Sequence, residues 1–298
     1  MIDYTVTVLI TACVYAIFAM GLNLQWGFTG LLNFGHIGFM AIGAYTTVLL
    51  SIHGIPLVLA IVIGMVLAGL FGLLMGIPTL RLREDFLAIV TIGFSEILRY
   101  ILLNEEWLSG GASGQGGFPR PLDDIVSAQD YKYVLLVILV ILVILVLVLL
   151  QRLVHSPWGR VLKSVREDEE VATALGKNAF SYKMQSLILG ATIAGLAGAF
   201  WAFKLRYIHP SVFDPMETFY AWIIVVLGGS GNNKGTIIGA ILFTFFLSGT
   251  KFLPDIFGLS DPQMAALRLM VVGALLMALM MFRPQGILGK KEELSLEK

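Results

Sequence analysis

Long apolar stretches with the length of membrane-spanning helices dominate the pattern of hydrophobic and polar positions along this chain of 298 residues. A bilayer core about 30 Å thick requires roughly 20 mostly apolar residues per helix. About nine stretches meet or approach that length, and the seventh is short enough to predict a broken or tilted helix. The stretches are residues 4–22, 31–52, 56–78, 86–103, 133–151, 184–205, 217–229, 235–252 and 264–282.

Composition supports a membrane location for these stretches. Hydrophobic residues make up 57% of the chain and charged residues only 13%, with a mean hydropathy of +0.86, whereas an ordinary soluble domain contains about 25% charged residues. The net charge of +0 and the lack of a Lys/Arg-rich run indicate no nucleic-acid partner. Cys13 is the only cysteine, which excludes a disulfide framework and a cysteine-based metal site. We therefore predict an all-α polytopic membrane protein.

Basic residues gather in three segments, and their positions predict the orientation of the helices in the membrane. Residues 79–85, 151–186 and the C-terminal segment from 283 onward contain most of the Lys and Arg. The positive-inside rule places all three segments in the cytoplasm. Residues 104–132 contain only two basic residues and are expected outside. The spans then alternate consistently, with the N-terminus outside and the C-terminus in the cytoplasm.

This orientation divides the chain into a transmembrane domain and a tail. The transmembrane domain comprises residues 1–286 and includes a charged cytoplasmic loop at 152–183, and residues 287–298 form a cytoplasmic tail. The span at 133–150 has no small residue and is expected to face lipid. Two other spans have small residues at four-residue spacing, a pattern that lets helices pack backbone to backbone and predicts core positions. These residues are Gly64, Ala68, Gly72 and Gly76 in one span, and Gly190, Ala191, Ala194, Gly195, Gly198 and Ala199 in the other.

Two breaks rich in glycine and asparagine interrupt the apolar pattern at matching places. Residues 21–36 and 228–235 each follow one apolar run and precede another, which indicates a weak internal repeat. Non-helical backbone at membrane depth is tolerated where it is buried in protein or lines a cavity, and paired breaks in a transporter indicate a substrate path. The other interpretation is that both breaks are ordinary loops at the cytoplasmic surface. The candidate residues of the path are Asn23, Gln25, Asn33, His36, Thr91 and Ser95.

Ionisable residues inside the apolar runs are few. Glu96 and Arg99 lie three residues apart on one helix face and are expected to form a structural ion pair. Lys204, Arg206 and Glu217 lie at span ends, from which long side chains can reach the membrane surface. No nucleotide-binding, metalloprotease or nucleophile-elbow motif occurs, so we assign no catalytic, cofactor-binding or metal-binding residues.

The loop at 155–176 predicts two short amphipathic helices. Ser156 followed by Pro157 is a typical helix start, with the serine hydroxyl as the expected cap. Asp168 can cap a second helix, and Gly176 supplies a left-handed stop. The loop contains four consecutive acidic residues, whereas helices that lie on lipid headgroups are usually rich in Lys and Arg. We therefore expect the loop to dock to a partner protein.

The end of this loop resembles the E-A-A-x-x-x-G loop of ABC-importer permeases. Glu170, Val171 and Ala172, followed by Gly176, match that pattern with valine in place of the first alanine. In that family the loop forms the coupling helix, which sits in a groove of a cytoplasmic ATPase subunit. The resemblance implies that Glu169, Glu170, Ala172 and Gly176 couple this chain to an ATPase.

Further stretches are similar to the LivM-type permeases of branched-chain amino-acid importers, and the similarity covers most of the chain. One difference lies in the predicted outside loop. There residues 110–117 read Gly-Gly-Ala-Ser-Gly-Gln-Gly-Gly, where such permeases often have a Gly-Pro-Asn-Gly-like stretch. The similar stretches are Asn23-Leu24, Gly30 to His36, Arg81 to Arg99, Leu227 to Gly231 and Gly235 to Gly239.

The resemblance implies a permease subunit of an ATP-driven importer for branched-chain or other neutral amino acids, in the inner membrane of a prokaryote. It implies an extracytoplasmic binding protein, a second similar permease and two cytoplasmic ATPase subunits as partners. ATP and Mg would bind to the ATPase subunits, and this chain would hold no cofactor. Importers of urea and short-chain amides use closely similar permeases, so the resemblance does not distinguish these substrates from amino acids. The residues alone do not exclude three other classes of protein. These are an ion-coupled secondary transporter, a membrane-embedded enzyme and a purely structural subunit.

Overall fold

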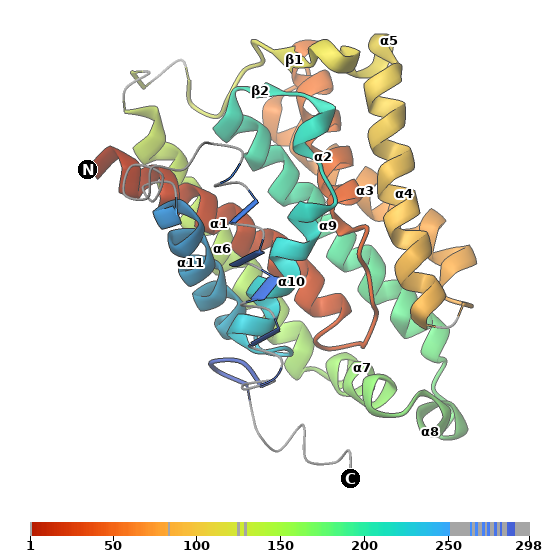
Figure 1. Ribbon diagram of the computed structural model, residues 1–298. Helices are drawn as coiled ribbons and strands as arrows, with labels where there is room; N and C mark the ends of the chain where they lie inside the picture. Colours follow the sequence, from red (N-terminus) through yellow and green to blue (C-terminus); the bar gives the residue numbers. More distant parts are fainter. Residues whose placement is uncertain are drawn as a thin grey trace.

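The computed structural model describes residues 2–82, 84–123, 126–127 and 130–250, isolated positions between 263 and 281, and the turn at 285–289, with the backbone alone described at 84 and 85. The described chain is almost entirely helical and forms one bundle (Figure 1). The helices are α1 (Ile2–Gln25), α2 (His36–Ile52), α3 (Leu57–Thr79), α4 (Glu84–Asn104), α5 (Glu106–Ser109), α6 (Tyr131–His155), α7 (Pro157–Glu167), α8 (Glu169–Ala174), α9 (Ala179–Leu205), α10 (Met216–Gly228) and α11 (Asn233–Gly249), with two short 3-10 helices, η1 (Gly111–Ser113) and η2 (Pro210–Val212).

Six helical segments of the described chain are long and apolar enough to cross a membrane. They are α1, α3, most of α4, α6, α9 and the segment Pro210–Gly228 that joins η2 to α10, while α2 and α11 are shorter apolar helices. The fold is therefore that of an all-α polytopic membrane protein, as predicted. Each of the first eight predicted spans overlaps a helix. The ninth, 264–282, and the tail from 290 fall mostly outside the described residues.

The helices begin and end where polar and glycine residues interrupt the apolar pattern. The second predicted span, 31–52, is helical only from His36 onward, because the residues before it form a loop. Within that loop the Asn33 side-chain oxygen accepts a hydrogen bond of 2.9 Å from the Gly35 backbone N–H. The seventh span is short, as predicted, since α10 has 13 residues and is followed by Gly229 with a φ of 106°.

Two helices, α1 and α9, form the centre of the bundle. Helix α9 packs against α1, α2 and α3, and α1 also packs against α6, α10 and α11. A methyl group added to Gly195 of α9 would lie 2.7 Å from the Ala68 Cβ and 3.2 Å from the Gly64 carbonyl oxygen. One added to Gly72 would lie 2.9 Å from the Ala191 Cβ. The predicted small residues thus allow α3 and α9 to approach closely, which is how helices gain packing energy in lipid.

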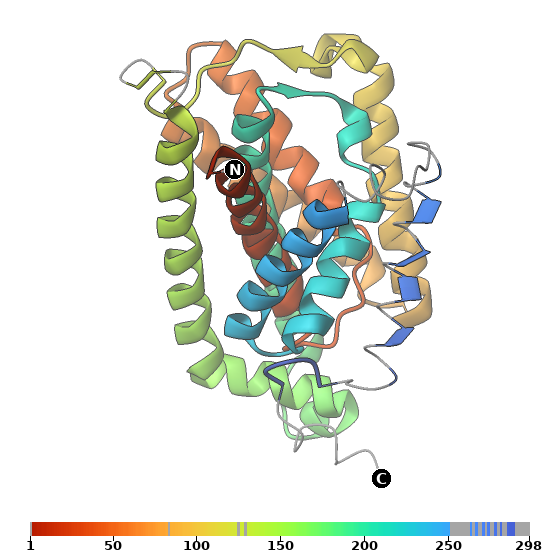
Figure 2. The ribbon, with the colours of Figure 1, turned by 60° about the vertical axis from the view of Figure 1, so that its left-hand side comes forward.

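Helix α6 lies at the edge of the bundle (Figure 2), and its two faces differ in exposure. Leu135, Leu139 and Val143 are buried, on the side that contacts α1. Ile141 and Leu145 on the other side are half exposed and apolar. An exposed face with this composition suits contact with lipid tails, as the absence of small residues in this span predicts.

The two ends of the bundle differ in what covers them (Figure 1). At one end a two-residue strand, β1 (Gln115–Gly116), pairs antiparallel with β2 (Tyr207–Ile208). This small sheet joins the segment after α5 to the segment after α9, and we call this end the sheet end. Helices α7 and α8 form the predicted coupling loop, residues 152–183, and lie at the opposite end, which we call the coupling-loop end.

Candidate translocation and coupling site

The two glycine-rich breaks lie against each other at the coupling-loop end of the bundle. Asn23, near the end of α1, joins them with both ends of its amide. Its side-chain N–H donates to the Asn233 side-chain oxygen at 2.9 Å, and its oxygen accepts from the Gly231 backbone N–H at 2.9 Å. A methyl group on Gly27 would overlap both Asn23 and the Gly231 backbone. The breaks, which lie about 200 residues apart in sequence, therefore form one packed unit.

The polar residues of the first break are hydrogen-bonded to one another and to α9. Asn33 donates from its side-chain N–H to the Gln25 side-chain oxygen at 2.8 Å. Gln25 in turn donates to the Leu187 carbonyl at 3.1 Å. A methyl group on Gly190 would overlap the Gln25 amide, so α9 leaves room for this side chain. Polar groups that are buried together in this way hold non-helical backbone inside a protein that spans a membrane.

The remaining candidates of the path lie where α2 and α4 meet the first break. Thr91 of α4 accepts a hydrogen bond of 3.1 Å from the Phe34 backbone N–H. Ser95 donates to the carbonyl one turn earlier, and His36 lies 3.2 Å from the Phe18 carbonyl through its Nε2. All six candidates are buried: Asn23, Gln25, Asn33, His36, Thr91 and Ser95. The structure brings them together around the first break, and their role in a path stays a prediction.

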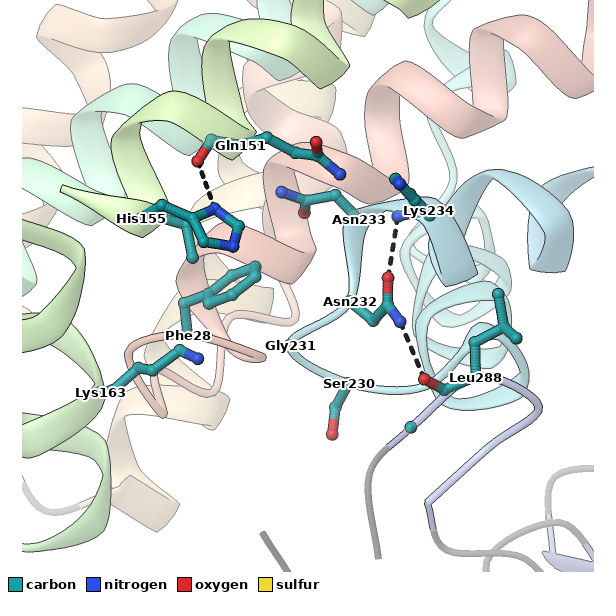
Figure 3. Close-up of a pocket in the computed structure, with 12 residues that line it drawn as sticks. Phe28, Gln151, His155, Lys163, Ser230, Gly231, Asn232, Asn233, Lys234 and Leu288 are labelled. Atoms are coloured by element: carbon teal, nitrogen blue, oxygen red, sulfur yellow. Dashed lines mark hydrogen bonds between the residues drawn. The ribbon is translucent and has the colours of Figure 1, made fainter. Parts of the chain in front are cut away.

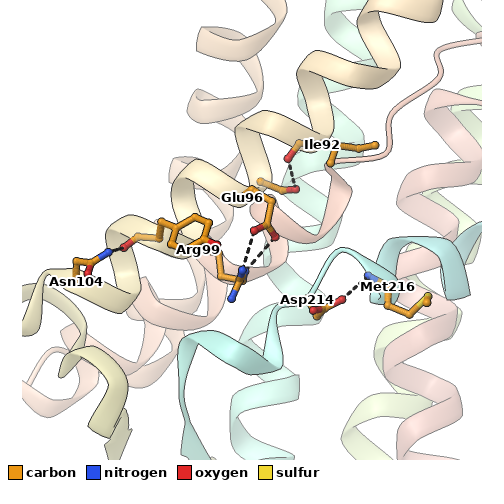
Figure 4. A network of polar contacts seen from close by, with 8 residues as sticks. Ile92, Glu96, Arg99, Asn104, Asp214 and Met216 are labelled. Carbon is orange, nitrogen blue, oxygen red and sulfur yellow. Dashed lines mark hydrogen bonds and ion pairs between the residues drawn. The ribbon is translucent and has the colours of Figure 1, made fainter. Parts of the chain in front are cut away.

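The charged residues of α4 form the expected pair. Glu96 accepts two hydrogen bonds from Arg99, of 2.7 and 3.0 Å, in the i,i+3 arrangement. Both side chains are partly exposed, at 27% and 19%. The Arg99 guanidinium also lies 4.9 Å from the centre of the Tyr100 ring. Figure 4 shows Asp214, in the segment before α10, on the side toward which Arg99 points.

The loop between α6 and α9 folds into the two short helices that its sequence predicts. The Asp168 carboxylate caps α8 by accepting a hydrogen bond of 2.9 Å from the Val171 backbone N–H. Gly176 ends the helix with a φ of 78°. The expected cap of α7 is wrong, because the Ser156 hydroxyl donates to the Leu153 carbonyl at 2.6 Å instead. Ser156 directly follows α6, whose last carbonyls need donors.

Helix α8 exposes both apolar and acidic side chains at the surface of the protein. Val171 and Leu175 are 54% and 72% exposed, whereas Ala172 is buried against the neighbouring helices. Glu170 is exposed, and Glu169 forms an ion pair with Lys183 of α9. Exposed apolar side chains beside a carboxylate, on a helix at the end of the bundle, suit docking to another protein. The assignment of Glu169, Glu170, Ala172 and Gly176 to coupling stays a prediction.

Helix α7 is attached to the first break by a residue that the sequence analysis did not single out. The Arg166 guanidinium donates a hydrogen bond to the Gly27 carbonyl, inside the break. Its side chain also packs against Gly30, where an added methyl group would lie 3.3 Å from the Arg166 Cγ. On the other side, Trp158 donates to the Gln185 side-chain oxygen of α9 at 2.7 Å. Helix α7 is therefore hydrogen-bonded directly to both the first break and α9.

A cavity of about 320 Å³ lies where both breaks meet α6 and α7 (Figure 3). Phe28 of the first break and the residues from Ser230 to Lys234 of the second break form part of its wall. Lys163 of α7 and His155 at the end of α6 also line it, so together with Lys234 basic side chains from three segments line one space. The cavity places the coupling loop and both breaks around a common polar opening.

Glu217 is placed differently from the sequence-based expectation. It lies in the first turn of α10, and its carboxylate accepts a hydrogen bond from the hydroxyl of Tyr15, which is buried in α1. The side chain therefore points into the bundle, toward α1. Tyr15 and Glu217 are 202 residues apart, so no local spacing in the sequence reveals their contact.

Comparison with known proteins identifies the family. The family model described as branched-chain amino acid transport system / permease component matches residues 4–280. The high-affinity branched-chain amino acid transport system permease protein LivM of Escherichia coli (strain K12) is 33% identical, over 95% of this chain and 70% of the relative. The probable branched-chain amino acid transport permease protein LivM of Methanocaldococcus jannaschii is 26% identical, over 97% of this chain and 94% of the relative.

The similarity extends to a second type of permease. The permease protein LivH of Salmonella typhimurium (strain LT2), from a high-affinity branched-chain amino acid transport system, is 26% identical over 93% of this chain and 92% of its own length. No solved structure matches the chain at a significant level. Because the family model covers nearly all of the described helices, this chain belongs to the family of permease components of branched-chain amino acid transport systems.

Proposed function

We propose that this chain is the membrane-spanning permease subunit of an ATP-driven importer for branched-chain or other neutral amino acids. Family membership and the names of the relatives support the transport role. The structural observation that supports it best is the chain of contacts at the coupling-loop end. Arg166 connects α7 to the first break, and Asn23 connects the first break to the second.

The proposed orientation follows from the basic residues and agrees with the arrangement of the two ends. Helices α7 and α8 would face the cytoplasm, together with the basic loop 79–85. The sheet end, with residues 104–123 and 206–215, would face outside and meet the binding protein. The protein would lie in the inner membrane of a prokaryote, with residues 1–286 spanning it and 287–298 forming a cytoplasmic tail.

The proposed mechanism assigns ATP hydrolysis and its Mg to two separate ATPase subunits. An ATPase would bind α8 through Glu170 and the exposed Val171 and Leu175. Closure of the ATPase pair on ATP would move α7 and α8 as one body, since Asp168 links the two helices directly. Arg166 would pass this movement to the first break. The hydrogen bonds of Asn23 would carry it onward to α11.

The substrate path would run between this chain and a second similar permease, beside the first break. The six buried polar residues supply amides, hydroxyls and one imidazole, which suit a polar substrate that passes without tight binding. His36 has a side-chain nitrogen, Nδ1, with no hydrogen-bond partner among the described residues. A rearrangement of the break that exposes these groups would open the path.

Reconstituted uptake tests the proposal. The chain, a second permease and the ATPase subunits are purified together and placed in liposomes, with the binding protein outside. We expect radiolabelled L-leucine to accumulate only with ATP inside and the binding protein present. Accumulation that needs no ATP and stops when ion gradients are collapsed would contradict the proposal and favour a secondary transporter.

Competition in the same assay separates amino acids from urea and short-chain amides as substrates. Excess unlabelled L-valine or L-isoleucine is expected to block leucine uptake, whereas urea or acetamide is expected to leave it unchanged. Uptake of labelled urea in place of leucine would assign the chain to a permease for urea or short-chain amides.

A further inference from the structure

A second cavity lies at the sheet end, away from the two breaks. It has a volume of about 440 Å³ and is formed by α1, α9, α10 and α11. Its volume falls within the roughly 300–1,000 Å³ of small-molecule sites in proteins. Figure 2 shows α1 and α11 lying side by side in front of the bundle. The Tyr4 hydroxyl donates to the Ser248 carbonyl at 2.8 Å, which ties the two helices together beside the cavity.

The cavity contains a carboxylate in a helix of the membrane-spanning part. Glu217 lines it from the first turn of α10 and is held by the Tyr15 hydroxyl. A carboxylate at such a position is costly unless it has a function or a partner, and it marks a candidate site by default. Because Tyr15 is a fixed, buried donor, it orients the carboxylate toward the space between the helices.

A cation lines the same cavity from a different helix. Lys204 lies in the last turn of α9, with its ammonium 4.1 Å from the centre of the Trp201 ring. Trp201 and Tyr15 pack together, with their ring centres 5.6 Å apart. One side of the cavity thus carries a positive charge over an aromatic surface, and α10 contributes the negative charge.

A buried hydroxyl in the cavity has an unused hydrogen-bonding group. Thr244 of α11 lines the cavity and is only 1% exposed, and its hydroxyl has no hydrogen-bond partner among the described residues. A buried polar atom without a partner is costly, by an amount that a bound ligand can remove. This hydroxyl is an observation independent of the two charges.

We propose that this cavity binds a zwitterionic amino acid on its way from the binding protein to the path, an inference that rests on the proposed function. The α-ammonium group binds Glu217, and the α-carboxylate binds Lys204 in charge-assisted hydrogen bonds. The apolar side chain packs on Trp201 and Tyr220, and Thr244 hydrogen-bonds one of the polar groups. The cavity therefore selects substrates that carry both charges, which urea and simple amides lack.

Equilibrium binding to the purified transporter complex, without the binding protein, tests this site. The probe is radiolabelled L-leucine, with 4-methylpentanoate (leucine without its amino group) and 3-methylbutan-1-amine (leucine without its carboxylate) as competitors. We expect the wild-type complex to bind leucine and neither competitor to displace it. Glu217→Gln is expected to weaken leucine binding by about tenfold or more and to let 4-methylpentanoate compete. Lys204→Met is expected to let the amine compete instead.

Glu106→Gln is the matched control, because Glu106 is an exposed glutamate of α5 that does not line the cavity. It removes one carboxylate charge elsewhere in the protein, so we expect leucine binding within about threefold of wild type and unchanged selectivity. Unaltered competition in both Glu217→Gln and Lys204→Met would overturn the site. So would the absence of leucine binding to a wild-type complex that imports leucine with its binding protein, and in that case the proposed function would stand. Failure of that import itself would contradict the proposed function.

Discussion

In the proposed mechanism, Arg166 is the residue that passes movement of the coupling loop to the first break. Its guanidinium donates to the Gly27 carbonyl in the first break, and its side chain is 20% exposed. Replacement by methionine keeps most of the packing against Gly30 and removes the hydrogen bond to Gly27, together with the partly exposed ion pair to the neighbouring Glu167. Helix α7 would then move without pulling on the break, so we expect ATP hydrolysis to continue while transport fails.

The size of the effect follows from the contact that is lost. A hydrogen bond from a charged donor to a partly buried acceptor contributes about 1.5–3 kcal/mol. Because about 1.4 kcal/mol corresponds to a factor of ten, a loss of this size changes the equilibrium between coupled and uncoupled states by roughly 10–100-fold. The amount of leucine imported per ATP hydrolysed is expected to fall by that factor. Protein stability is expected to change less, since α7 keeps its contacts through Trp158.

The assay measures leucine uptake and phosphate release in the same proteoliposomes, and the result is their ratio. Arg160→Met is the matched control, because Arg160 is an exposed arginine of the same helix. We expect its ratio to equal that of wild type. A ratio for Arg166→Met within twofold of the control would refute the idea that this contact transmits movement.

Three further predictions concern other parts of the account. Gly176→Pro and Glu170→Lys are expected to abolish the stimulation of ATP hydrolysis by the loaded binding protein, because they disturb the end and the charge of α8, and normal stimulation in both would refute the coupling assignment. Asn23→Val is expected to lower the free energy of unfolding by about 1–3 kcal/mol and to stop uptake, because it leaves buried groups of the second break without partners; thermal unfolding in detergent measures this, and an unchanged melting temperature would contradict it. Gly198→Leu is expected to prevent accumulation of the folded chain in membranes, whereas Gly93→Ala, with open space around it, is tolerated; equal yields of the two would refute the packing of α9.

Much of the fold could be predicted because membrane-spanning helices are recognised in a sequence as long apolar stretches. Eight of the nine predicted apolar stretches overlap a helix of the described chain, and small residues at four-residue spacing marked the close contact of α3 with α9. The cap and the end of α8 in the coupling loop could also be predicted from the sequence. Asp168 and Gly176 act through the backbone within three or four residues of themselves, so their roles depend little on the rest of the protein.

The contacts that define the candidate sites were not predictable in this way. Arg166 and Gly27 are 139 residues apart, and Tyr15 and Glu217 are 202 residues apart. Each pair forms only because several helices pack in one arrangement, and no periodicity in the sequence encodes it. The cap of α7 that was predicted at Ser156 was wrong for a related reason. The preceding helix supplies the Leu153 carbonyl, which accepts the hydrogen bond of the Ser156 hydroxyl.

Crosslinking that shows whether α8 contacts an ATPase subunit is the most direct test of the proposed coupling. In the assembled transporter, with Cys13 replaced by serine, a photoreactive probe is attached to a cysteine at Val171 of α8 or at Trp107 of α5, both of which are exposed. We predict that Val171→Cys crosslinks to the ATPase and Trp107→Cys crosslinks to the binding protein. Crosslinking of Val171→Cys to the binding protein, or of Trp107→Cys to the ATPase, would contradict both the proposed orientation and the coupling mechanism.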